Sequence, residues 1–225
     1  MKNLILIAAP GAGKGTLANE LKDKYNYTHI STGDLLREAA AKGDELGRQI
    51  HEMQTNGLLV TDEIVAGALK NRLMESDCEK GYILDGYPRT VKQAEMYDEI
   101  LKELNKDLGL VIVLDIDKEL LIERITGRRL CRGCDAIYNI YNTELTPKDE
   151  HTCDKCGGEL YQRSDDNLSS LETRYSTYIE KTQPLIDYYN NKNSLYRVNS
   201  NFGSKETLRQ VTELLEKLGD SVDKN

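Results

Sequence analysis

Apolar residues along the chain follow two patterns that alternate from one end to the other. Five short runs are typical of strands, three of them strongly apolar, and between them apolar residues recur at every third or fourth position, as in amphipathic helices. Strands that alternate with helices favour a parallel sheet with helices on both faces. We therefore expect an α/β fold with a doubly wound parallel sheet, whose strands lie near residues 4–7, 27–30, 82–85, 110–115 and 195–198.

The loop between the first strand and the first helix has the composition of a phosphate-binding loop. It reads AAPGAGKGT over residues 8–16. Its glycines allow backbone N–H groups to turn toward a phosphate, the helix N-terminus adds a positive dipole, and Lys14 supplies a mobile cation. A dinucleotide-binding loop would need a third glycine where Thr16 stands, so we set that alternative aside. Ala8 replaces the usual first glycine, and a positive φ there would cost about 1 kcal/mol.

Two of the apolar runs end in a carboxylate, at the edge of a parallel sheet where α/β proteins bind their ligands. These carboxylates, Asp85 and Asp115, are both candidates for the shell of a Mg²⁺ ion. A rigid turn at residues 86–89 follows the first of them and would bring Arg89 beside the phosphate loop. The sequence therefore favours Asp85.

Other polar residues near these loops have a structural explanation as well as a functional one. Ser31 and the acid three residues after it are close to a capping box for the helix that follows. Gln93 is placed to answer Thr90 in a second capping box. Arg37, one turn into the first of these helices, fits a substrate phosphate and a solvated surface equally well.

Cations are concentrated near the middle of an otherwise acidic chain. Arg124 and Arg128 are four residues apart, which predicts that they share one face of a helix from Asp117 to Gly127, and Arg129 adds a third charge. A solvated face and a functional site are both compatible with this pattern.

Four of the five cysteines form two C-x-x-C pairs, Cys131 with Cys134 and Cys153 with Cys156, separated by 18 residues. Four thiolates at this spacing bind Zn²⁺ tetrahedrally, and they leave no open position for catalysis, so we expect structural zinc. Redox-active thiols are the alternative. The segment between the pairs has few apolar residues, so we expect a small β-rich flap that depends on the metal to fold. Cys78 is expected to be a small buried apolar residue.

Composition narrows the class of protein. The chain has 225 residues, a formal net charge of −8 and a pI near 5.1, which argues against a general nucleic-acid surface. The first apolar run is too short for a signal peptide, and no segment has the length of a membrane span. We expect a cytoplasmic protein that acts as a monomer, without nucleic-acid or membrane partners.

These motifs, taken in order, resemble the adenylate kinase family in its long form with a zinc-holding lid, across nearly the whole chain. The resemblance implies reversible transfer of a phosphoryl group, Mg-ATP + AMP = 2 ADP, in adenine nucleotide homeostasis. It implies Mg²⁺ and structural Zn²⁺ as cofactors and ATP, AMP and ADP as substrates. It also implies a five-stranded sheet of P-loop kinase type in a core at 1–30, 61–127 and 162–225, with a helical nucleoside monophosphate-binding insertion at 31–60 and a zinc-binding β lid at 128–161.

The resemblance also implies roles for individual residues. Those expected to bind ATP lie in the loop and the lid: Pro10, Gly11, Ala12, Gly13, Lys14, Gly15, Thr16, Arg124, Arg128 and Tyr138. Those expected to bind AMP are Thr32, Gly33, Arg37, Leu58, Val60, Gly86, Arg89, Gln93, Arg163 and Arg174. The expected catalytic groups are Lys14, Asp85, Arg89, Arg124, Arg163 and Arg174. Asp165 and Asp166 are expected to support the closed lid, and the four paired cysteines to bind the metal.

Three alternatives remain at this point. The nearest is a pyrimidine nucleoside monophosphate kinase, although residues 31–34 resemble the adenine-specific form and the long lid does not fit that class. A zinc-ribbon nucleic-acid-binding module regulated by ATP would use the cysteine segment to present arginines, against the negative net charge. The third is a thiol switch that responds to oxidants. Asn139, where many adenylate kinases carry histidine, distinguishes the lid of this chain.

Overall fold

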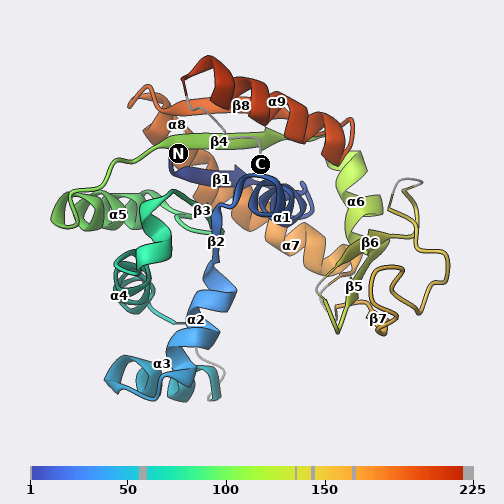
Figure 1. Ribbon diagram of the computed structural model, residues 1–225, viewed down its shortest axis with the longest axis horizontal. Coiled ribbons are helices and arrows are strands. Elements are labelled where there is room, and N and C mark those ends of the chain that lie inside the picture. The colour runs from blue at the N-terminus through green and yellow to red at the C-terminus, as the bar shows by residue number, and fades with distance from the viewer. Residues whose placement is uncertain (1, 56–59, 135, 143–144, 164–165, 220–225) are drawn as a thin grey trace.

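A computed structural model of the chain describes residues 2–55, 60–134, 136–142, 145–163 and 166–219. Its central feature is a five-stranded sheet with the strand order β2-β3-β1-β4-β8, in which every neighbouring pair is parallel (Figure 1). The predicted fold class is confirmed. The strands are β1 Leu4–Ala8, β2 Thr28–Ser31, β3 Tyr82–Asp85, β4 Leu110–Asp115 and β8 Leu195–Asn199.

Two apolar cores lie on the two faces of this sheet, because successive side chains of a strand point in opposite directions. Leu4 and Leu6 of β1 belong to one core, with α1, α6, α7 and α9, whereas Ile5 and Ile7 belong to the other, with α4, α5 and α8. The helices packed around the sheet are α1 Lys14–Tyr25, α4 Asp62–Leu73, α5 Val91–Glu103, α6 Lys118–Thr126, α7 Leu168–Thr177, α8 Gln183–Asn190 and α9 Ser204–Lys217.

Two shorter segments complete the core. A 3₁₀ turn, η1 Ser76–Glu79, precedes β3, and Cys78 within it is buried as predicted. A π-helical turn, η2 Tyr178–Thr182, joins α7 to α8, so that the two helices are separated by one wider turn. Within the described residues, no helix has both the length and the apolar character that crossing a membrane requires.

A helical arm follows β2 and projects away from the sheet (Figure 1). It consists of α2 Thr32–Ala41 and α3 Glu45–Thr55. The Ser31 hydroxyl accepts a hydrogen bond from the Asp34 backbone N–H at 3.2 Å, so the predicted helix cap is formed. The arm thus begins directly at the carboxyl end of β2, beside the ends of β3 and β1.

A second, smaller sheet lies after α6 and is antiparallel, with the order β6-β5-β7. Its strands are β5 Arg128–Cys131, β6 Ile137–Asn139 and β7 Leu160–Tyr161. The expected β-rich flap is therefore present. One expectation was wrong: Arg128 does not share a helix face with Arg124, because α6 ends at Thr126 and Arg128 is the first residue of β5.

Candidate functional site

The phosphate loop joins β1 to α1 with the backbone geometry that its glycines permit. Gly11 has a φ of 82° and Gly13 a φ of 98°, in the region that favours glycine. A Cβ at Gly11 would also approach Ile125 Cγ1 to 2.8 Å. Ala8, by contrast, is the last residue of a strand and is not among the residues with positive φ, so its methyl group carries no backbone strain.

Several cations converge on Lys14, whose ammonium group donates a hydrogen bond to the Ala8 carbonyl at 3.2 Å. Burial lowers the pKa of Lys14; the Asp85 carboxylate opposes this effect, and the guanidinium groups of Arg89, Arg174 and Arg128 add to it. The three arginines come from the turn before α5, from α7 and from β5. Like charges gathered around one lysine make a site for a multiply charged anion.

Asp85, at the end of β3, is held between Lys14 and a histidine that the sequence analysis did not single out. The Nε2 atom of His29 on β2 lies 3.6 Å from Asp85 Oδ2. Burial alone would raise the pKa of Asp85, but His29, Lys14 and Arg89 outweigh burial and leave that pKa below its usual value. The carboxylate therefore stays charged beside the phosphate loop, as a group near a divalent cation must.

Arg124 connects the phosphate loop to the segment after β8. Its guanidinium donates to the Ser200 carbonyl at 2.6 Å, to the Ser200 hydroxyl at 3.3 Å and to the Ala12 carbonyl at 3.4 Å. The Ser200 hydroxyl itself donates to Ala12 at 2.7 Å, and its residue is 2% exposed. Burial lowers the pKa of Arg124. Ser200 is a second residue that the sequence analysis missed.

Arg128 is paired with Asp166 across the base of the small sheet. The Arg128 Nε atom donates to Asp166 Oδ2 at 2.9 Å, and its Nη2 atom donates to the other carboxylate oxygen. The Asp166 side chain has no exposed surface. Arg163 is exposed in this conformation, and Asp165 lies outside the described residues.

The turn after Asp85 brings the backbone, Arg89 and Thr32 close together. Gly86 has a φ of 87°, and a Cβ there would lie 3.0 Å from Arg89 Nη2 and 3.2 Å from Thr32 Oγ1. Arg89 Nε donates to the Gly86 carbonyl at 2.7 Å, and Thr32 Oγ1 donates to the Asp85 carbonyl at 3.4 Å. Only glycine fits this position, because it alone combines the positive φ with the close approach.

The sequence left two roles open for Gln93, one in a capping box and one in the binding site, and the contacts of Gln93 bear on both. Its backbone N–H donates to the Thr90 hydroxyl at 3.2 Å, so Thr90 caps α5 as predicted. Its side chain, however, accepts from the Arg89 N–H at 2.7 Å and donates to Asp62 Oδ1 at 2.7 Å. The amide thus ties the arginine turn to the first residue of α4, instead of closing the capping box.

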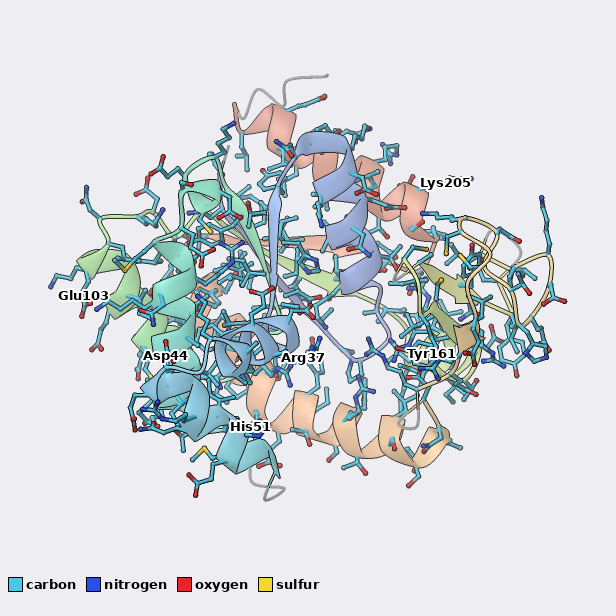
Figure 2. All side chains as sticks on the ribbon, turned by 60° about the horizontal axis from the view of Figure 1, so that its bottom comes forward. Arg37, Asp44, His51, Glu103, Tyr161 and Lys205 are labelled. Carbon is cyan, nitrogen blue, oxygen red and sulfur yellow. The ribbon has the colours of Figure 1, made fainter. Side chains whose placement is uncertain are left out.

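The remaining residues expected at this end lie along the helical arm. Arg37 is on α2, between the sheet and the outer helix α3, which carries His51 (Figure 2). It is paired with Asp34, and its side chain is 69% exposed. Gly33 lies next to it, with its would-be Cβ 3.4 Å from Arg37 Nη1. Val60 packs partly against the core, and Leu58 lies outside the described residues.

The four paired cysteines come together in the small sheet and its loops. The Sγ atoms of Cys131 and Cys156 are 3.4 Å apart and those of Cys134 and Cys153 are 3.7 Å apart, and all four lie within 4.8 Å of one another. A tetrahedron of sulfurs around Zn²⁺ with bonds of about 2.3 Å has edges of about 3.8 Å, so the cluster fits the ion. A Cβ at Gly158 would come within 3.1 Å of Cys131 Sγ, so the backbone closely encloses the sulfurs.

Tyr138 belongs to this sulfur cluster in the structure. Its hydroxyl lies 3.4 Å from Cys153 Sγ, and the residue is 8% exposed. The hydrogen bond from Tyr138 lowers the pKa of the Cys153 thiol. The prediction that Tyr138 also contacts ATP stays a prediction, and its side chain has a separate role beside a metal ligand.

Comparison with known proteins supports one reading of this geometry. The chain matches the family model for adenylate kinase over residues 6–194. The chain belongs to the adenylate kinase family. It is 50% identical over 216 residues to an adenylate kinase of Archaeoglobus fulgidus, an alignment that covers 96% of this chain and 99% of the relative. It is 45% identical over 213 residues to an adenylate kinase of Fervidobacterium nodosum, covering 95% of this chain and 97% of the relative.

Family membership confirms the resemblance seen in the motifs. The chain is a nucleotide-binding kinase, and transfer of a phosphoryl group between ATP and AMP is its reaction. The pyrimidine kinase and the nucleic-acid-binding module are not favoured. His29 and Ser200 were missed because their importance depends on which strands are neighbours, which no local motif reports.

Proposed function

We propose that this chain catalyses reversible Mg-ATP + AMP = 2 ADP by gathering positive charge around the transferred phosphoryl group. The observation that supports this most strongly is the convergence of Arg89, Arg128 and Arg174 on Lys14. A phosphoryl group in transfer passes through a loose transition state, for which in-line placement and dispersed positive charge matter more than a covalent or basic catalyst. The arginines come from separate elements, so they surround the group instead of lining one side of it.

On the donor side, the backbone N–H groups of residues 10–16 bind the ATP phosphates, with Lys14 on the outer phosphates and Arg124 and Arg128 beside them. Thr16, in the first turn of α1, and Asp85 flank the place of the cation. Bound there, Mg²⁺ would neutralise part of the charge on the ATP phosphates. The Asp85 carboxylate would contact that ion through water, and His29, whose Nε2 lies 3.6 Å from it, flanks the carboxylate.

On the acceptor side, Arg89 and Arg37 bind the α-phosphate of AMP, and Thr32, Gly33 and Gly86 line the path to it. Gln93 reads the adenine of AMP once its amide leaves Asp62 or Arg89. Leu58 and Val60 add apolar contact with the base. Arg163 and Arg174 reach the phosphoryl group from the far side.

We infer a division of the chain into a core at 1–30, 61–127 and 162–225, an AMP-binding arm at 31–60 and a lid at 128–161. Closure of the lid excludes water, which prevents hydrolysis of ATP when AMP is absent. The pair of Arg128 with Asp166, and Asp165 beside it, brace the base of the lid. Structural Zn²⁺ at the four cysteines holds the lid folded.

We also infer that the protein is a monomer in the cytoplasm. All five cysteines are free thiols, which fits a reducing compartment. The net charge of −8 opposes self-association. Sedimentation of the purified protein would test the monomer directly.

The experiment that tests the proposed function is a coupled assay of ADP formation from Mg-ATP with AMP, UMP, CMP or GMP as the acceptor. Fast turnover with AMP alone is expected. Turnover with UMP or CMP in place of AMP would instead support the pyrimidine kinase. Inactivity with every acceptor would contradict the proposal.

A further inference from the structure

The turn between β3 and α5 is held in place at Arg89 by contacts from both near and far along the chain. The Arg89 backbone N–H donates to Gln93 Oε1 at 2.7 Å, and its Nε atom donates to the Gly86 carbonyl at 2.7 Å. The Arg89 carbonyl accepts a hydrogen bond from the Thr182 hydroxyl at 3.1 Å, across 93 positions of the chain. Thr182 therefore joins the arginine turn to a distant helical segment.

Thr182 is the last residue of the π-helical turn η2, and a proline explains why the helix widens there. Pro184 has no N–H, and in a regular α-helix its ring would clash with the Glu180 carbonyl four residues before it. In the structure the Gln183 N–H donates instead to the Tyr178 carbonyl, five residues back. Single π-helical turns of this kind are frequent at functional sites.

The hydroxyl of Thr182 is used differently from those of the threonines before it. Thr173 and Thr177 on α7 donate to carbonyls four residues back, at 3.1 and 2.9 Å, as threonines inside helices commonly do. Thr182 directly precedes α8, but its side chain makes no capping hydrogen bond to that helix. Its hydroxyl instead leaves its own helical segment and reaches Arg89, so the contact belongs to the tertiary structure.

The same helical segment also carries Arg174, which approaches the phosphate loop. In Figure 1, α7 runs from the small sheet of the lid back toward the five-stranded sheet. Arg174, Tyr178 and Thr182 follow one another at four-residue intervals along α7 and η2, and all three are half-buried. Residues four apart share one face of a helix. This face therefore holds Arg174 through its backbone and Arg89 through the Thr182 hydroxyl.

The separation of these two arginines matters for the chemistry of the site. The guanidinium groups of Arg89 and Arg174 both lower the pKa of Lys14, so both lie close to the place of the transferred phosphoryl group. Catalysis of phosphoryl transfer consists mainly of positioning and of placed charge. A displacement of about 1 Å caused by a distant change can cost about 10²-fold in rate.

We propose that Thr182 is a positioning residue for the reaction, whose hydroxyl fixes the Arg89 carbonyl and thereby sets the distance between Arg89 and Arg174. This proposal rests on the proposed function. Without the hydroxyl, the turn keeps its local contacts to Gly86 and Gln93 but is no longer tied to the helix of Arg174. The acceptor side of the site should therefore be affected more than the donor side, which β1 and α6 hold in place.

The test compares Thr182→Val, Thr182→Ser and Thr177→Val with the parent. Valine keeps the shape of threonine and removes the donor, so Thr182→Val is expected to lower kcat/KM for AMP about tenfold. The KM for Mg-ATP should stay within twofold. Thr182→Ser keeps the hydroxyl and should restore the parent value.

Thr177→Val is the matched control, because it makes the same substitution on the same helical segment, at an exposed threonine whose hydroxyl bonds within its own helix. It should leave both kinetic constants unchanged. The melting temperatures of the four proteins should lie within about 4 °C of one another, because one hydrogen bond at most is lost. A purely structural role would lower the melting temperature and would affect ATP and AMP alike.

A second measurement follows the arginine turn without the reaction. The Nε–H of Arg89 gives a ¹H–¹⁵N signal, which its loss in Arg89→Lys assigns, and this N–H donates to the Gly86 carbonyl. The signal should move in Thr182→Val and stay in place in Thr182→Ser and Thr177→Val.

Three outcomes would overturn the proposal: parent kinetics in Thr182→Val, an equal loss of activity in Thr182→Ser, or an Arg89 signal that does not move in Thr182→Val. If the parent forms no ADP, the proposed function fails, and the Arg89 signal alone then decides whether Thr182 holds the turn.

Discussion

The five-stranded core and the lid are stabilised by different physical means. The core has a large apolar cluster on each face of its sheet. Among the described residues of the lid, the buried apolar cluster consists of Cys131, Ala136, Tyr138, Cys153 and Leu160, and two of these belong to the group of four cysteines. We expect a segment with so little apolar surface to bury to depend on a metal for folding, and the core to fold without one. A protein that closes over its substrate can therefore have a lid whose stability is set separately from that of the core.

The same difference applies to the site residues of the core and of the lid. Asp85 is the last residue of β3, and Lys14 is the first residue of α1, after the loop that follows β1, so their positions depend on the packing of the sheet. Arg128 and Tyr138 lie in the small sheet, and their positions depend on an ion pair and on the sulfur cluster. Removing the metal should therefore affect closure, while the phosphate loop stays formed.

Metal removal should give the largest difference between the two regions. Structural zinc contributes on the order of 10 kcal/mol to the folding of small metal-dependent units. In a chelated sample, hydrogen exchange should become fast in residues 128–161 and stay slow in the central strands, and turnover should be lost. Cys153→Ala should reproduce this result, and Cys78→Ala, which leaves the cluster intact, should keep the metal. Slow hydrogen exchange in residues 128–161 of the metal-free protein would contradict the expectation that the lid depends on the metal for its folding.

Loss of the loop lysine should remove catalysis and leave both regions folded. Lys14→Ala is expected to lower kcat by about 10²–10³, because one preorganised charge on the reacting group is lost. Lys24→Ala, at an exposed position of the same helix, serves as the control and should keep full activity. Steady-state kinetics and a thermal melt of each variant provide the measurement. A Lys14→Ala enzyme with normal kcat would exclude this lysine from the reaction.

Breaking the ion pair at the base of the lid should destabilise the protein. Asp166→Asn leaves the guanidinium of Arg128, 18% exposed, without its buried partner, at a cost of about 3 kcal/mol. Glu159→Gln breaks a pair with Arg132 in the same lid, in which both side chains are more than half exposed, and should have no measurable effect. Urea unfolding compares the two variants. Equal urea midpoints for the two variants would show that the buried ion pair contributes no more to stability than the exposed one.

The smallest expected effect is a loss of core stability at acid pH. Arg72 binds both oxygens of Asp77 at 2.7 and 2.6 Å and lowers the pKa of that carboxyl to about 2. The pKa of Asp77 in the folded protein lies below its value of about 3.9 in the unfolded chain. The ion pair therefore contributes its full stability at pH values above about 3.9. Its contribution is lost as the pH falls from about 4 through about 2. The stability of Asp77→Asn should therefore depend less on pH in this window, which acid unfolding followed by circular dichroism would reveal.

Much of the fold could be predicted because its signals are local. The strands β1, β3 and β4 are short apolar runs, and each cap, such as Ser31 or Thr90, lies three residues from the N–H whose hydrogen bond it accepts. The phosphate loop and the paired cysteines are also local, since their chemistry depends on spacing along the chain. For these features the residue types and their separation are sufficient.

The side-chain partners could not be predicted, because they depend on which strands and loops are neighbours. His29 lies beside Asp85 only because β2 pairs with β3 in a register that places Ser31 opposite Asp85. Arg124 reaches Ser200 and Ala12 only because α6 lies against two loops far away in the sequence. The sequence by itself determined the fold class, the phosphate loop and the pairs of cysteines that form one cluster, through apolar periodicity and short-range spacing. The tertiary structure alone decided which charges meet, because those contacts join residues that no local pattern connects.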